Sequence, residues 1–157
     1  MSKRHGKEAV VDIRRAGLND LGRVAVLFDL YRQFYGRTGN IRGACDFIGQ
    51  RLEAGDSVIF LAIADDGDAA GFVQLYPGFS SVSMARTYIL NDLFVVPAFR
   101  RQQVASGLLA QATAFAQASG AVRLSLSTAV DNVRAQALYE RCGWKKDELF
   151  LHYTFSL

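Results

Sequence analysis

The sequence predicts an α/β fold: a mixed, mostly antiparallel central sheet with helices on both faces. The chain has 157 residues and 50% of them are hydrophobic, which is enough for one domain with its own core. Strand and helix patterns follow one another in the order β-α-α-β-β-β-α-β-α-β, and a strand leading into a helix at residues 88–120 is typical of a crossover connection. We therefore expect a single domain over residues 1–157, in which residues 1–8 form a flexible tail.

The first part of the chain predicts a strand at residues 10–14 and then two helices. Asn19 offers an N-cap to the first helix, which we expect to end near Gly36. Apolar residues recur at helical spacing in the second helix, over residues 44–52, and Gly55 is a typical stop. The apolar stripe of the first helix consists of Leu21, Val24, Phe28, Tyr31 and Tyr35.

A β-hairpin is expected next. Residues 57–64 and 70–76 are apolar, and the segment between them is rich in turn-forming residues. Pro77 and the glycine after it indicate a turn, so we expect the second strand to end before them. A long strand at residues 87–96 follows and ends at Pro97, because proline cannot donate to a β-ladder.

The remaining elements alternate between helix and strand. We expect a helix over residues 103–120 and a strand at residues 122–128. A further helix begins at residue 131 or 132 and ends at residue 143. Residues 149–155 alternate in polarity and predict a final strand, on which His152 is expected to be structural or at the rim of a substrate site.

Charge and hydropathy restrict the class of protein. The net charge is +3 and the pI about 9.0, but part of this excess lies in the basic head of the chain. That head is a solvated tail or a nucleic-acid-binding arm, and the absence of a basic helix or aromatic platform favours the tail. No apolar run approaches the roughly 20 residues of a membrane span, and no secretory signal pattern begins the chain. We expect a cytoplasmic protein with no membrane partner.

The cysteines and histidines indicate neither disulfides nor a metal site. Cys45 and Cys142 are too few for a disulfide framework, and with His5 and His152 they give no metal-ligand spacing. We expect reduced thiols and no metal. Cys142 is expected to be packed rather than nucleophilic, since nothing in the sequence indicates an activated thiolate.

The most informative segment is residues 93–109, LFVVPAFRRQQVASGLL. A strand runs into a short basic turn and then into a helix whose first residues are small. A helix N-terminus presents unpaired N–H groups and a positive dipole end, so it can bind a phosphate. Ala105, Ser106 and Gly107 would let the anion approach the backbone, and Arg100 and Arg101 add positive charge. An ordinary strand-to-helix turn with solvated arginines is the alternative.

This segment resembles the pyrophosphate loop of the GNAT family of N-acetyltransferases, which pass an acetyl group from acetyl-CoA to an amine. The family pattern is Arg or Gln, two residues, Gly, one residue, then Gly or Ala, preceded by Val-x-Pro. Residues 95–105 match this pattern except at Gln103, where the family usually has Gly. A side chain at this position would crowd the pyrophosphate, or force a backbone adjustment if φ must be positive.

A second segment, residues 127–144, resembles the later motif of the same family. The matching residues are Asn132, Ala135, Leu138, Tyr139, Gly143 and Trp144. The resemblance implies that Tyr139 lies next to the CoA sulfur and donates a proton to the departing thiolate; a core aromatic residue is the alternative. Asn132 binds the pantetheine arm, caps its helix, or does both.

The acceptor side of the site is expected at residues 90–95, Leu-Asn-Asp-Leu-Phe-Val, which are similar to the family branch that acetylates polyamines, histone-like peptides and other basic amines. Because strand side chains alternate, Asn91 and Asp92 are not expected to face the same cleft. The Asp92 carboxylate would attract an ammonium group and help to remove its proton, unless it serves as a local cap or salt-bridge partner. Tyr31 and Tyr35 line the acceptor pocket or belong to the core stripe.

Together these features imply an acetyl-CoA-dependent N-acetyltransferase in which a primary amine of a small molecule or peptide attacks the thioester directly. Asp92 and Tyr139 are the expected catalytic residues, and the backbone N–H groups of residues 94–96 would polarise the acetyl carbonyl. The expected acetyl-CoA-binding residues are Phe94, Val95, Val96, Arg100, Arg101, Gln103, Val104, Ala105, Ser106, Gly107 and Asn132.

Two other functions stay open at this point. Gln103 in the phosphate loop is compatible with a module that binds CoA without turnover. The pI alone suggests a small basic nucleic-acid-binding protein. The family resemblance also implies a homodimer.

Overall fold

The computed structural model describes residues 10–157, so the predicted tail at residues 1–8 lies outside the described residues. The described chain up to Ser127 forms one compact unit, and Thr128–Leu157 forms a second.

The first unit contains one sheet with the strand order β1-β2-β3-β4-β5. The first four strands are antiparallel to their neighbours, whereas β5 is parallel to β4, which confirms the predicted mixed, mostly antiparallel sheet. The strands are β1 (Val11–Arg15), β2 (Val58–Ala64), β3 (Ala69–Ser80), β4 (Ala85–Val95) and β5 (Arg123–Ser125). The strand predicted at residues 122–128 is therefore shorter than expected.

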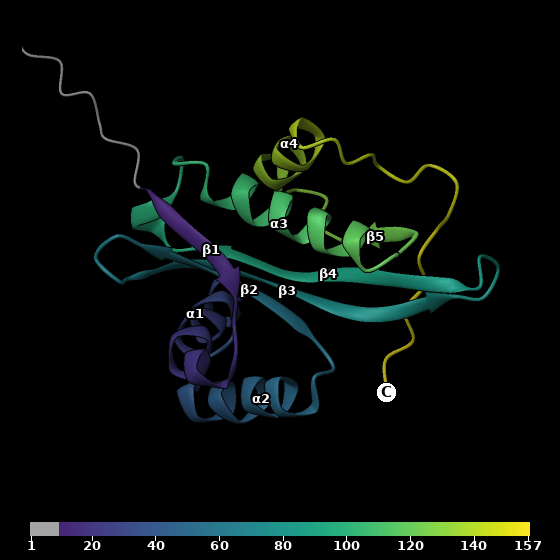
Figure 1. Cartoon of the computed structure of the whole chain (residues 1–157). Helices are drawn as coiled ribbons and strands as arrows, with labels where there is room; N and C mark the ends of the chain where they lie inside the picture. Colours follow the sequence, from purple (N-terminus) through teal and green to yellow (C-terminus); the bar gives the residue numbers. More distant parts are fainter. Residues whose placement is uncertain (1–9) are drawn as a thin grey trace, which may run out of the picture. The chain divides into compact units, whose positions relative to one another are not determined.

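Helices cover both faces of this sheet, as predicted: α1 (Leu21–Phe34) and α2 (Ile41–Ala54) lie on one face and α3 (Val104–Ala118) lies on the other (Figure 1). On the face of α1 and α2, the buried apolar cluster includes Leu27, Ile48, Ile59, Leu61, Phe72 and Phe94. On the opposite face, the ring of Phe115 in α3 makes edge contacts with Phe60 and Tyr88, at centroid distances of 5.7 and 5.4 Å. Each face of the sheet thus has its own apolar layer.

The predicted N-cap of α1 is wrong. A 3₁₀ turn over Leu18–Asp20 includes Asn19, and Asp20 is the cap residue. The Asp20 carboxylate accepts a hydrogen bond from the backbone N–H of Gly17 at 2.9 Å and two from the Arg14 guanidinium at 2.9 and 2.7 Å. One buried carboxylate therefore connects the end of β1 to the start of α1.

The predicted turn at Pro77 is also wrong, because β3 continues through Pro77 to Ser80 and pairs with β4 along its whole length. The pairing of β2 with β3 stops at Val58 and Leu75. Beyond Leu75, one side of β3 is an edge, where a residue without an N–H group removes no ladder hydrogen bond.

A β-bulge interrupts β4 at Asn91. Gln74 pairs with Asp92, but the next residue, Leu75, pairs with Leu90, so Asn91 is an extra residue on β4. The Asn91 side-chain nitrogen lies 2.9 Å from Asp92 Oδ1. The bulge breaks the strict alternation of side chains, so these two side chains contact each other; whether they face one cleft stays a prediction.

β4 and β5 separate beyond the first part of β4. They pair only over Thr87–Ile89 and Arg123–Ser125, whereas β4 stays paired with β3 up to Val95. From Leu90 to Val95, the other side of β4 has no strand partner among the described residues. This opening lies directly before the loop that leads to α3.

The second unit contains one helix, α4 (Val133–Arg141). Asn132 is its N-cap, as expected, and accepts a hydrogen bond from the backbone N–H of Ala135 at 3.2 Å. Gly143 follows the helix with φ of 88°, a conformation typical of a helix stop. Cys142 is exposed rather than packed.

The final strand predicted at residues 149–155 is wrong, because this segment has no regular secondary structure. Its described hydrogen bonds are local: the Asp147 carboxylate accepts from the backbone N–H groups of Leu149 and Phe150 at 2.9 and 3.2 Å. Such side-chain to backbone bonds compete with a β-ladder, and alternating polarity alone supplies no pairing partner. Among residues 10–157, no helix is long and apolar enough to cross a membrane.

Candidate active site

The loop between β4 and α3 has a strained backbone. It begins with a 3₁₀ turn over Pro97–Phe99, and both Arg101 and Gln103 have positive φ, at 59° and 62°. Gln103 is also the N-cap residue of α3. Glycine adopts this left-handed conformation freely, whereas a residue with a Cβ adopts it at a cost. Gln103 therefore keeps the positive φ that the family's glycine would adopt freely, and its effect on the pyrophosphate stays a prediction.

The N-terminus of α3 fits a phosphate group. The first i to i−4 hydrogen bond of the helix runs from Gly107 N–H to the Gln103 carbonyl, at 3.0 Å. The backbone N–H groups of Val104, Ala105 and Ser106 precede this ladder, where helical N–H groups lack intrahelical partners. The Ser106 hydroxyl donates to the Gln103 carbonyl at 2.9 Å and so stays close to the backbone. N–H groups, small side chains and the positive helix end together suit the pyrophosphate of CoA.

Gly107 has a packing role on the side of α3 that faces β1. A Cβ atom at this position would lie 2.8 Å from Cδ1 of Ile13. The missing side chain therefore allows the helix to approach the sheet closely. The part of Gly107 in acetyl-CoA binding stays a prediction.

Arg100 connects the loop to the end of β4 and to α1. Its Nε donates to the carbonyl of Val95 at 3.0 Å. Its guanidinium carbon lies 5.9 Å from the ring centroid of Phe34 and 5.8 Å from that of Phe94. The guanidinium charge is thus held beside the opening of β4 by a hydrogen bond and two aromatic rings.

Of the backbone N–H groups at residues 94–96, the geometry directs one into the opening. Val96 N–H donates to the carbonyl of Ala70 at 2.9 Å, so this amide is occupied, contrary to the expectation. N–H groups alternate in direction along a strand, so Phe94 N–H also points toward β3 and Val95 N–H points away from it. The Val95 carbonyl lies on the same side as its N–H and accepts from Arg100.

Asp92 is a buried carboxylate on the face of the sheet that α1 covers. It is 2% exposed, and it lies two residues before Phe94, which belongs to the apolar cluster of that face. Gln74 Nε2 donates to Oδ2 and Asn91 Nδ2 donates to Oδ1, the latter at 2.9 Å. Asp92 makes no ion pair with any residue in the described range 10–157. The salt-bridge alternative for Asp92 therefore has no partner in the described chain.

The environment of Asp92 favours its protonated form. Burial raises the pKa of Asp92, and hydrogen bonds from Gln74, Asn91 and Tyr31 oppose this rise. The pKa of Tyr76 is raised to about 12, first by burial and then by the charge of Asp92. A carboxylate with a raised pKa is a stronger base than one in water, so it can take a proton from an ammonium group more readily.

Aromatic residues of α1 lie next to Asp92. The Tyr31 hydroxyl donates to the backbone carbonyl of Asn91 at 3.3 Å. Its ring contacts Phe72 and Tyr35 in edge-to-face geometry, at 6.1 and 5.0 Å. The ring of Tyr31 therefore packs on the core, as one interpretation expects, and its hydroxyl reaches the backbone beside Asp92. The place of Tyr31 in an acceptor pocket stays a prediction.

Two residues of β3 beside Asp92 were not predicted from the sequence. Gln74 pairs directly with Asp92, and Tyr76 is near enough for the charge of Asp92 to raise its pKa. A signal was present for Gln74, which is the one residue with a polar amide in the otherwise apolar run 70–76. No sequence signal distinguishes Tyr76 from a core aromatic residue.

The remaining predicted residues belong to the second unit. The ring of Tyr139 lies 6.1 Å from that of Trp144, and the Asn132 side chain caps α4. His152 lies in the irregular segment that follows. The acid role of Tyr139 and the pantetheine contact of Asn132 stay predictions.

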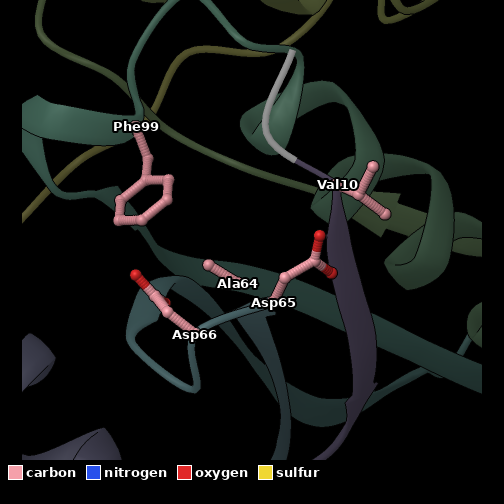
Figure 2. Close-up of a pocket in the computed structure, with 5 residues that line it drawn as sticks. All are labelled: Val10, Ala64, Asp65, Asp66 and Phe99. Atoms are coloured by element: carbon pink, nitrogen blue, oxygen red, sulfur yellow. The ribbon is translucent and has the colours of Figure 1, made fainter. Parts of the chain in front are cut away.

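A separate small pocket lies where β1 begins and β2 turns into β3 (Figure 2). It is lined by Val10, Ala64, Asp65, Asp66 and Phe99. Its two carboxylates would repel a phosphate, so this pocket does not suit the anionic part of CoA. Within residues 10–157, no group of His, Cys, Asp and Glu side chains could hold a metal ion.

Comparisons with known proteins agree with this geometry. The sequence model described as the "Acetyltransferase (GNAT) family" matches residues 24–144. The chain is 44% identical over 147 residues to the uncharacterized N-acetyltransferase YhfO of Bacillus subtilis, covering 94% of this chain and 98% of that protein. A crystal structure of a probable acetyltransferase has a TM-score of 0.89 at 44% identity, covering 93% of this chain and 97% of that one.

A more distant likeness concerns the fold. An aminoglycoside N-acetyltransferase solved in complex with CoA has a TM-score of 0.78 at 21% identity, covering 97% of this chain and 99% of that chain. The extent of the family match and the identity to YhfO establish more than the fold. The chain belongs to the acetyltransferase (GNAT) family and is an acetyl-CoA-dependent N-acetyltransferase.

Proposed function

We propose that the protein acetylates a primary amine of a small molecule or peptide by direct attack of the amine on the thioester of acetyl-CoA. The observation that carries the acceptor side is Asp92, a buried carboxylate with two amide donors and no cationic partner among residues 10–157. A buried carboxylate without a counter-ion attracts an ammonium group strongly and is poised to accept its proton. Acetyl-CoA supplies the activated acetyl group.

The chain's own residues would share the remaining tasks. The N-terminus of α3 and the Arg100 and Arg101 side chains bind phosphates, and the Val95 N–H group orients and polarises a carbonyl at the opening of β4. Asp92 removes a proton from the acceptor ammonium. Tyr139 donates a proton to the departing thiolate, and Asn132 contacts the pantetheine arm. Support for these last two roles is the match of residues 127–144 to the family's later motif.

The acceptor is proposed by class. The similar structure named above acts on aminoglycosides, and residues 90–95 resemble the branch that acetylates polyamines and histone-like peptides. Among the described residues, the two other buried carboxylates are already paired, Asp20 with Arg14 and Asp29 with Arg32. Asp92 is the buried carboxylate that can bind an ammonium group, which favours acceptors that present a single amine at this point.

A thiol-release assay with acetyl-CoA tests the proposal on kanamycin, spermidine, tyramine and a lysine-containing peptide, with calorimetry of acetyl-CoA binding alongside. We expect CoA release and amide formation in equal amounts with at least one amine. Binding of acetyl-CoA without turnover of any amine in the panel would contradict the proposed acceptor class.

The acid role has its own test. Tyr139→Phe removes one hydroxyl and keeps the ring, so we expect turnover to fall about 10²–10⁴-fold while acetyl-CoA affinity holds. Unchanged turnover would assign Tyr139 to packing. A proportional loss of turnover and affinity would show that the hydroxyl serves binding.

We also propose that both units form one acetyltransferase domain over residues 1–157, since the family match at residues 24–144 runs across the boundary between them. A single cooperative thermal transition, raised as a whole by acetyl-CoA, is the expected result. A homodimer is proposed from the family resemblance, and light scattering of the purified protein tests it. The cytoplasmic location stays a prediction from the sequence, which has no apolar run of membrane-span length.

A further inference from the structure

Gln74 is an unusual residue for its position. It lies in the middle of β3 with 0% exposure, between the buried residues Val73 and Leu75. Burying an amide costs free energy unless its hydrogen bonds are satisfied, and an aliphatic side chain would fill the same space without this cost. The position therefore calls for a polar role that packing alone does not provide.

The amide of Gln74 uses only its donor. Nε2 donates to Oδ2 of Asp92, whereas Oε1 is buried and has no hydrogen-bond partner among the described residues. The other carboxylate oxygen, Oδ1, accepts from the Asn91 side chain, which the bulge places there. Each oxygen of Asp92 thus receives one amide hydrogen, and one acceptor beside Asp92 is left without a donor.

We propose that Gln74 is a positioning residue that serves both protonation states of Asp92: it donates from Nε2 to the carboxylate and, after the side-chain amide rotates, accepts at Oε1 from the protonated carboxyl group. Rotation about the terminal torsion exchanges the two atoms, which have nearly the same size. This inference rests on the proposed role of Asp92 as the base.

The proton balance is simple. An N–H bond of the acceptor ammonium breaks, its electron pair stays on the nitrogen, and an O–H bond forms on Asp92. The carboxylate becomes neutral and so does the amine. The new hydroxyl group of Asp92 would then face the N–H groups of Gln74, so two buried donors would lie together without an acceptor. This arrangement costs free energy, and it is avoided when the amide turns its oxygen toward the hydroxyl.

The other polar groups around Asp92 do not offer a buried acceptor for its protonated carboxyl group. From α1, the Tyr31 hydroxyl faces Asn91 and Asp92, and from β3 the Tyr76 phenol does so with a pKa raised to about 12. From the end of α2, Arg51 lies near Tyr76 and is paired with Asp56 at 2.7 Å. Of the neighbours that hydrogen-bond Asp92, Gln74 has the buried acceptor that lacks a partner.

The test is a pH titration followed by NMR, which needs no acceptor amine. Protein with ¹³C-labelled aspartate carboxyl groups is titrated, and Asp92→Asn assigns the Asp92 signal. We expect Gln74→Met, which has a similar shape and no amide, to raise the titration midpoint of Asp92 by about one pH unit, because a charge-assisted hydrogen bond is about twice as strong as a neutral one. Val73→Ala is the matched control, since Val73 is equally buried on the opposite face of β3, and it should leave the midpoint unchanged.

In the wild type, the ¹⁵N signal of the Gln74 side-chain amide should shift with the same midpoint as the Asp92 carboxyl group. The proposal would be overturned if the Gln74 side-chain signal did not shift at this pH, or if Asp92 in Gln74→Met titrated with the same midpoint as in the wild type. If Gln74→Met does not fold, Gln74→Glu replaces it: two adjacent carboxyl groups should then titrate in two separated steps, and an unchanged single step would overturn the proposal equally.

Kinetics separate this inference from the function on which it rests. The acidic limb of kcat/KM for the most active amine of the panel should move with the NMR midpoint in Gln74→Met, and Asp92→Asn should abolish that limb. If Asp92→Asn turned over normally, Asp92 would not be the base, yet the NMR titration would still decide whether Gln74 controls its protonation.

Discussion

Asp92 is held in a position that reduces the stability of the fold. Burial raises its pKa, so the folded chain binds this proton more tightly than the unfolded chain does. By linkage, stability then falls as the pH rises from the unfolded pKa through the raised folded pKa. If Asp92 is the base proposed above, this loss of stability accompanies a carboxylate that is ready to accept a proton from an ammonium group.

Asp92→Asn should therefore stabilise the protein at neutral pH. The neutral amide removes the buried charge, and Gln74 can turn its free oxygen toward the new donor. We expect a gain of about 1 kcal/mol at pH 8, as is common when a functional group is removed from an unfavourable site, and convergence with the wild type near pH 4. Urea denaturation at both pH values measures this, and a variant less stable than the wild type at both would contradict it.

Gln103 also reduces stability, because its φ of 62° suits glycine. Gln103→Gly should raise the free energy of unfolding by about 1 kcal/mol and tighten acetyl-CoA binding. The matched control is Gln102→Gly, the same exchange one residue earlier, where φ is not positive; it should cost about 0.5–1 kcal/mol. Thermal unfolding with and without acetyl-CoA measures both effects. Weaker acetyl-CoA binding by Gln103→Gly would show instead that the glutamine contributes a contact.

At the scale of elements, the junction of β1 and α1 depends on the ionised form of Asp20. Its pKa is lowered to about 2, chiefly by the hydrogen bond from Arg14, against a usual value of 3.8. A folded pKa below the unfolded one gives stability that is present above about pH 4 and is lost as the pH falls through about 2. We expect Asp20→Asn to lose about 2 kcal/mol at pH 6 and little at pH 2. Denaturation of both proteins at both pH values measures it, with Asp46→Asn on the exposed side of α2 as the control; an equal loss at both pH values would contradict the ionic origin.

Two glycines at element contacts should respond differently to alanine. At Gly71 a Cβ atom would lie 2.6 Å from the backbone oxygen of Phe94, whereas at Gly107 it would meet only the tip of the Ile13 side chain, at 2.8 Å. A backbone atom in a ladder cannot move cheaply, so Gly71→Ala should cost about 1–3 kcal/mol or more. In Gly107→Ala, the helix propensity of alanine, about 1 kcal/mol, offsets much of the strain. Unfolding midpoints of the two variants test this order, and a larger loss for Gly107→Ala would reverse it.

At the scale of the whole molecule, the order and type of most elements could be predicted because each depends on a local pattern. The apolar stripe that ends at Gly55 is enough to predict α2. The basic turn that is followed by small residues is enough to identify the loop before α3. Features that depend on pairing between distant segments could not be predicted. Pro77 is tolerated in β3 only because β2 ends its pairing at Leu75. The alternating segment 149–155 contains no information on whether a partner strand exists.

The candidate site shows the same limit. The phosphate loop and Asp92 could be located from motifs, but the bulge at Asn91 follows from the register between β3 and β4, which no local pattern records. Gln74 enters the site only through that register. The sequence predicts that Val96 offers its N–H group to the acetyl carbonyl, but this group is bonded to Ala70 through the pairing of the same two strands.

If Asp92 is the base in acetyl transfer from acetyl-CoA to an amine, replacing its carboxylate must slow that transfer. The most direct measurement is the kcat/KM of Asp92→Asn and of the wild type for the most active amine of the panel at neutral pH, with acetyl-CoA affinity measured on the same samples. Loss of a general base predicts a fall of about 10²–10⁴-fold at unchanged acetyl-CoA affinity. Turnover of Asp92→Asn equal to that of the wild type would show that Asp92 is not the base.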